Sequence, residues 1–119
     1  MSDLRSRLFA LRDSIPSEVV EVDGIGPVTV RGLTAGARDE WEQRIYAAKG
    51  KPLRNVRAGL VALCVYDGGK PVFGSADVDA VGELPAAVVD RLYDVAARLS
   101  GMGPKDRETA EGNSEAADR

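Results

Sequence analysis

The chain has 119 residues, 44% of them hydrophobic and 29% charged, which suits one domain with its own core and excludes a wholly disordered protein. Its net charge of -3 excludes the broad positive field with which many proteins attract nucleic acid. Histidine is absent and Cys64 is the single cysteine, which excludes Ser–His and Cys–His catalytic pairs and an internal disulfide. We therefore expect no enzyme, no cofactor and no metal site, and a reducing compartment.

The N-terminal segment predicts a short helix. Residues 3–13 carry three leucines with the i, i+4, i+7 spacing of one helical face. Ser2 is the expected N-cap, and Pro16 ends the helix.

Two alternating segments then predict a β-hairpin, with Val20 and Val22 on one face and Val28 and Val30 repeating the pattern. Residues 23–26 hold two glycines and predict the turn. A dinucleotide-binding loop would need a third glycine and a following helix, so the turn is the favoured interpretation. A hairpin with one apolar face is marginal alone, and we expect helices to cover it.

The middle of the chain predicts two helices. Thr34 is expected to cap a helix over residues 34–49, with Trp41 on its apolar stripe. Residues 54–65 are the most apolar segment and predict a helix at the centre of the core. Residues 63–66 could instead already be a strand, and the following Asp-Gly-Gly-Lys would then form a turn that reverses the chain direction.

Two further helices complete the domain. Ser75 is expected to cap a short helix over residues 76–81. Pro85 suits the first turn of a last helix that ends near Leu99.

These elements predict an α+β fold, in which an N-terminal helix and β-hairpin pack against a small helical bundle. We expect a single globular domain over residues 1–103. Residues 104–119 contain no large apolar side chain that could offset the entropy of ordering, so we expect a disordered polar tail.

The last helix carries a wider apolar surface than one packing face needs. The expected core stripe consists of Val88, Leu92, Val95 and Leu99. A second apolar row beside it consists of Val89, Tyr93 and Ala96. In a small protein both rows can belong to the core, and the alternative is that the second row docks another protein. We take that second row, together with Trp41, as the candidate protein-binding set.

Three other clusters have simpler structural interpretations. Asp77, Asp79 and Glu83 lack the spacing of a calcium loop and complement the start of a helix. The basic residues between 44 and 57 lack the interleaved aromatic residues of a nucleic-acid surface, which favours a solvated loop or an acidic partner. Cys64 lies in the most apolar segment and is expected to be a buried structural thiol.

Four stretches stand out by their order along the chain. They are VRGLTAG with RDEWE (30–36 and 38–42), NVRAGLVAL (55–63), DGGKPVF (67–73) and LPAAVVDRL (84–92). Together, over about residues 18–103, they resemble the tail assembly chaperones of long-tailed, siphophage-type bacteriophages.

The resemblance implies a protein that binds the tape measure protein and helps recruit tail tube subunits during assembly. It implies action in the host cytoplasm and absence from the mature virion. No nucleic acid or membrane partner is expected, since the longest apolar run (59–66) is far shorter than the roughly 20 residues that cross a bilayer. Self-association is compatible with this role.

Two rival functions remain. One is a generic intracellular adaptor or regulatory module with a different protein partner. The other is a small enzyme that uses carboxylates or lysine alone, which would require a cleft of convergent carboxylates with perturbed pKa values.

Overall fold

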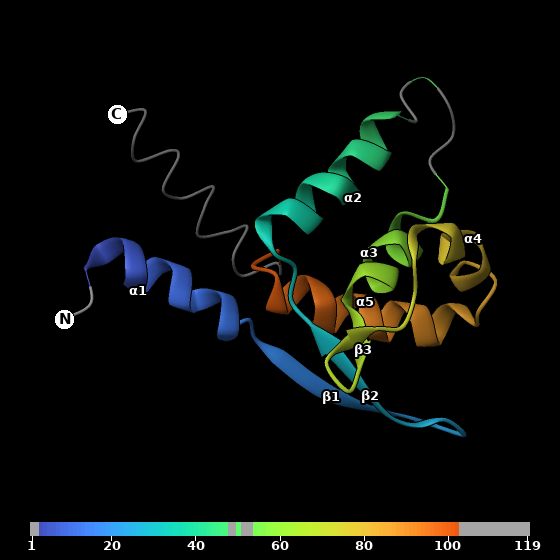
Figure 1. Cartoon of the computed structure of the whole chain (residues 1–119). Helices are drawn as coiled ribbons and strands as arrows, with labels where there is room; N and C mark the ends of the chain where they lie inside the picture. The colour runs from blue at the N-terminus through green and yellow to red at the C-terminus, as the bar shows by residue number, and fades with distance from the viewer. Residues whose placement is uncertain (1–2, 48–49, 51–53, 103–119) are drawn as a thin grey trace, which may run out of the picture.

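A computed structural model of the chain describes residues 3–47, 50 and 54–102. It confirms the α+β prediction: an antiparallel sheet in the order β1-β2-β3-β4 packs against helices (Figure 1). The elements are α1 (Leu4–Ala10), the 3-10 turn η1 (Leu11–Asp13), β1 (Ser17–Val22), β2 (Gly26–Arg31), α2 (Ala35–Ala47), α3 (Val56–Cys64), β3 (Val65–Asp67), β4 (Lys70–Pro71), the 3-10 turn η2 (Ser75–Asp77), α4 (Val78–Val81) and α5 (Ala86–Leu99). None of the helices in these described ranges has both the length and the apolar character needed to cross a membrane. The tail over residues 104–119 lies outside the described residues.

The hairpin forms as the alternating pattern predicts. β1 and β2 pair with Val20 opposite Val28, and the buried side chains of Val20 and Val30 face the helices. Gly24 and Gly26 lie at φ +81° and +103°, a backbone region that suits glycine and closes the turn.

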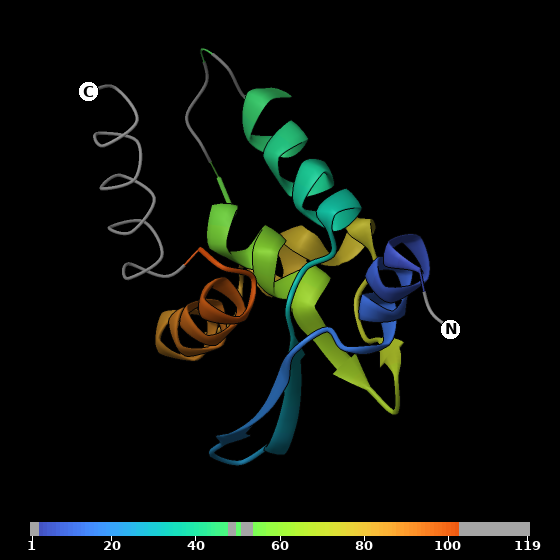
Figure 2. The same ribbon diagram turned by 90° about the vertical axis from the view of Figure 1, so that its left-hand side faces the viewer.

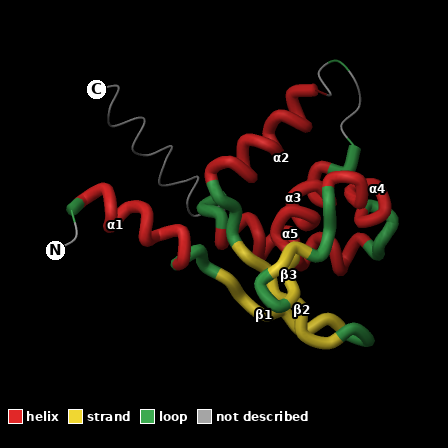
Figure 3. The backbone as a smooth tube through the Cα atoms, viewed as in Figure 1, coloured by secondary structure: helices red, strands yellow, loops and turns green. Residues whose placement is uncertain are grey.

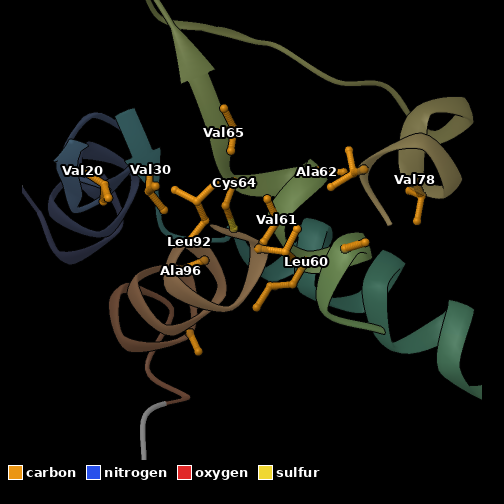
Figure 4. Close-up of a cluster of buried hydrophobic side chains, with 14 of the residues drawn as sticks. Val20, Val30, Leu60, Val61, Ala62, Cys64, Val65, Val78, Leu92 and Ala96 are labelled. Atoms are coloured by element: carbon orange, nitrogen blue, oxygen red, sulfur yellow. The ribbon is translucent and has the colours of Figure 1, made fainter. Parts of the chain in front are cut away.

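The helix α3 occupies the centre of the core (Figure 4). Leu60 is completely buried, which confirms the central position predicted for this segment. The helix ends at Cys64 and the chain continues directly into β3, where Val65 and Tyr66 pair with Val30 and Thr29. Both open alternatives for residues 63–66 therefore hold in part, since the first two are helical and the last two are strand.

The last helix, α5, packs against both α3 and the hairpin (Figure 2). Pro85 occupies its N-cap rather than the first turn. At the other end, Gly101 has φ +75° and the backbone N–H of Met102 donates to the oxygen of Ala97 at 2.8 Å, which closes the helix.

Two predicted caps differ in their outcome. The hydroxyl of Thr34 accepts from the backbone N–H of Ala37 at 3.1 Å, as expected for the N-cap of α2. Ser75, in contrast, lies inside η2, and the carboxylate of Asp77 accepts from the backbone N–H of Gly74 at 2.8 Å. The backbone N–H group before η2 therefore finds its hydrogen-bond acceptor within the turn itself.

The chain between β2 and α2 passes close to the C-terminal end of α5. The backbone N–H of Leu33 donates to the hydroxyl of Ser100 at 2.9 Å. Gly32 is buried, and a Cβ atom placed on it would lie 2.6 Å from the backbone oxygen of Leu99. This crossing therefore requires glycine at position 32.

One part of the predicted architecture differs: α1 does not pack on the domain. No residue of α1 or η1 is buried, and the helix projects from the start of β1 away from the other helices (Figures 1 and 3). Ser2 lies outside the described residues, and Asp3 forms the N-cap by accepting from the backbone N–H of Ser6 at 2.8 Å. That hydrogen bond lowers the pKa of Asp3.

Candidate functional site

The second apolar row of α5 lies largely inside the protein and does not form an exposed surface. Val89 is 7% exposed and Ala96 is completely buried, while Tyr93 is half-buried beneath the guanidinium of Arg57, 5.6 Å from the ring centroid. The prediction of a docking row was wrong in its placement because α5 has neighbours on two sides. A helix packed against both α3 and the hairpin uses two apolar rows as core.

An apolar groove of about 580 Å³ lies between the hairpin and the start of α5. It arises because β2 runs past β3: β3 pairs only with Thr29 and Val30, so residues 26–28 extend beyond it. The opposite wall comes from the chain after β4 and from the segment that enters α5. The groove is lined by Val22, Asp23, Ile25, Pro27, Val28, Thr29, Val61, Val65, Tyr66, Asp67, Val72, Phe73, Leu84, Pro85, Val88 and Leu92.

The groove presents large apolar side chains at its edges. Ile25 is 74% exposed, Val72 47% and Leu84 43%. Buried side chains such as Val65 and Leu92 lie beneath them, at the junction with the core. An apolar hollow rimmed by exposed apolar side chains is typical of a site for an apolar ligand or a partner's helix.

The charged side chains that line the groove are both acidic. Asp23 belongs to the hairpin turn and Asp67 to the turn between β3 and β4, and both are exposed. The two carboxylates lie on separate turns, and none of the described basic side chains lines the groove. This charge favours an apolar partner with positively charged flanks.

Trp41 lies at a second, smaller hollow of 290 Å³ between α2 and the α3–α4 region. Its indole N–H donates to the backbone oxygen of Val56 at 2.9 Å, so the polar atom of the ring is used within the chain. A Cβ atom on Gly59 would lie 3.4 Å from the ring, which shows how closely α2 approaches α3. Trp41 thus fixes α2 against the core.

The basic cluster predicted between residues 44 and 57 meets acids of its own chain. Arg57 pairs with Asp90 at 2.8 Å, and Arg44 lies 3.8 Å from Asp79. Lys49 and Lys51 lie outside the described residues. The two arginines therefore connect α2 and α3 to α4 and α5.

The remaining candidates have structural roles. Cys64 is completely buried, as predicted, and burial raises the pKa of its thiol to about 12. Asp79 accepts from the side-chain amide of Asn55 at 2.8 Å. Within the described part of the chain, no three His, Cys, Asp or Glu side chains are grouped as a metal site would require.

No known protein family, curated protein or solved structure matches this chain. The groove is lined by residues from three separate parts of the chain, within 22–29, 61–73 and 84–92, so no single motif could have identified it. One signal was available, because Ile25 is a large apolar residue within the predicted hairpin turn, where polar residues are common.

Proposed function

We propose that the protein is a tail assembly chaperone of a long-tailed bacteriophage, which acts by binding an apolar helical stretch of the tape measure protein. The observation that carries this proposal is the apolar groove between the hairpin and α5. The order of sequence stretches that resembles such chaperones supports it independently.

A tape measure protein must remain soluble before the tail tube surrounds it. A long helical chain with exposed apolar stripes aggregates unless those stripes are covered. A helix offers such a stripe through side chains at i, i+3, i+4 and i+7, and a groove with apolar walls accepts it. In this proposal the protein covers a stripe in the host cytoplasm, helps to bring tail tube subunits, and leaves before the virion is complete.

The two acidic turns make the groove favour helices with positively charged flanks. Asp23 and Asp67 would attract lysine or arginine beside the apolar stripe and would repel an acidic helix. A different protein partner with the same chemistry would make the protein an adaptor instead, and the identity of the captured chain separates these two functions.

We expect the double variant Val72→Asp with Leu84→Asp to lose its partner while it stays folded. Both side chains are about half exposed, so the new charges remain in water in the free protein but would lose that water against the partner's apolar stripe in the complex. The measurement is the soluble fraction of the tape measure protein, encoded by the same phage, when it is co-expressed with each variant.

The matched control is Val19→Asp with Tyr46→Asp, which also replaces two large exposed side chains with acids. Val19 is 59% and Tyr46 75% exposed, and neither lines the groove. The control should keep the tape measure protein soluble, as the unchanged chain does. A groove variant that folds, by circular dichroism, and still solubilises the tape measure protein would place the contact elsewhere, with the Trp41 hollow as the next candidate.

A further inference from the structure

The N-terminal arm, residues 3–13, is an amphipathic helix that the rest of the described chain leaves uncovered. Leu4, Leu8 and Leu11 share one helical face, with Phe9 beside it, and these four side chains are 46–62% exposed. Such a stripe of large apolar side chains on a short helix costs free energy in water and is stable only when something covers it.

The arm carries positive charge beside its apolar face. Residues 3–13 contain three arginines and two aspartates, a net charge of +1. The guanidinium groups of Arg5 and Arg12 lie over the ring of Phe9, at 4.8 and 5.2 Å from its centroid. The arm therefore presents the chemistry that the acidic, apolar groove favours, namely an apolar helix flanked by cations.

The arm and the groove of one chain lie at opposite ends of the hairpin. The arm joins the sheet at Ser17, which pairs with Arg31, whereas the groove lies by Val22, which pairs with Gly26. Five residue steps along β1 separate these ends by about 17 Å. The arm also points away from the body of the molecule, so the groove that it can enter readily is that of another molecule (Figure 1).

We infer that two copies of the chain exchange their N-terminal arms, so that the arm of each copy lies in the groove of the other. A helix over residues 4–13 is about 15 Å long and would place its leucines among the apolar walls. Arg5 and Arg12 would then lie near the carboxylates of Asp23 and Asp67. The exchange is reciprocal, as a two-fold dimer requires.

This dimer would keep the groove covered in the free protein and would open when a partner's helix displaces the arm. The inference uses the groove of the proposed function but does not depend on the identity of that partner. Its test uses the purified full chain alone, so a failure here leaves the co-expression result unaffected.

The test is sedimentation equilibrium of the unchanged chain and of three double variants over a range of concentrations. The unchanged chain should show a monomer–dimer equilibrium. The arm variant Leu4→Asp with Leu8→Asp and the groove variant Val72→Asp with Leu84→Asp should each raise the dissociation constant by about tenfold or more. The control Val19→Asp with Tyr46→Asp should dimerise like the unchanged chain.

Mixing the two impaired variants is the decisive measurement. The arm variant has an intact groove and the groove variant an intact arm, so the mixture should form a heterodimer through one complete contact, although neither variant dimerises alone at that concentration. A monomeric unchanged chain would overturn the inference, as would an arm variant that still dimerises. A groove variant that still dimerises would show instead that the arms pair with each other, and would also overturn it.

Discussion

Leu60→Ala should lower the free energy of unfolding by about 2–5 kcal/mol, the range for a leucine truncated inside a packed core. Leu60 is completely buried on α3, at the centre of the hydrophobic cluster (Figure 4). Its neighbours belong to packed elements that cannot collapse fully into the space, so the loss includes a cavity as well as the removed apolar contacts. Urea denaturation followed by circular dichroism measures the change.

The control is the same substitution at an exposed leucine. Leu4 on α1 is 62% exposed, so Leu4→Ala measured in dilute solution should change the free energy of unfolding by no more than about 0.5 kcal/mol. Equal effects at the two positions would show that α3 does not occupy the centre of the core.

Gly32→Ala is the second substitution with a large expected effect. The added methyl group would lie 2.6 Å from the backbone oxygen of Leu99, and backbone atoms at the end of a packed helix cannot rotate away as a side chain does. The segment between β2 and α2, which passes the C-terminal end of α5, must then shift, and this would weaken the hydrogen bond from Leu33 to Ser100. We expect a loss of about 1–3 kcal/mol in the free energy of unfolding, typical of overpacking.

Gly36→Ala provides the matched comparison four residues later. Gly36 lies in α2, and no atom outside its immediate surroundings lies within 4 Å of a Cβ placed there. Alanine favours helix over glycine by roughly 0.5–1 kcal/mol, so this variant should be as stable as the unchanged chain or slightly more stable. Thermal melting of both variants gives the sign directly: a Gly32→Ala protein as stable as Gly36→Ala contradicts the close approach to α5.

The elements that the sequence predicts well are those determined by local patterns. Alternating valines and a turn with two glycines produce the hairpin, and the hydroxyl of Thr34 caps α2. The apolar character of residues 54–65 correctly places that segment in the core. Periodicity could not locate the change from helix to strand after Cys64, because the same apolar residues continue across it and the pairing with β2 decides the boundary.

The candidate site depends on tertiary arrangement, and here the sequence was a poorer guide. The two apolar rows of α5 look alike along the chain, and only its position between α3 and the hairpin shows that Val89 and Ala96 are core. The amphipathic pattern of α1 identifies an apolar face but not the surface that covers it. Likewise, the groove exists because β2 extends beyond β3. This follows from the relative lengths of the paired strands, which no local sequence pattern predicts.

Hydrogen–deuterium exchange of the arm variant Leu4→Asp with Leu8→Asp, whose groove no N-terminal arm covers in the free protein, tests the central claim most directly when it is measured with and without the tape measure protein. If a partner's helix fills the groove, amide protection should increase in the hairpin turn (residues 22–29), around β3 and β4 (65–73), and at the entry to α5 (84–92). The backbone of α2 should exchange at the same rate in both states, because it lies outside the groove. Protection confined to α2 and the Trp41 hollow, or an unchanged groove in a complex that forms, would contradict the account.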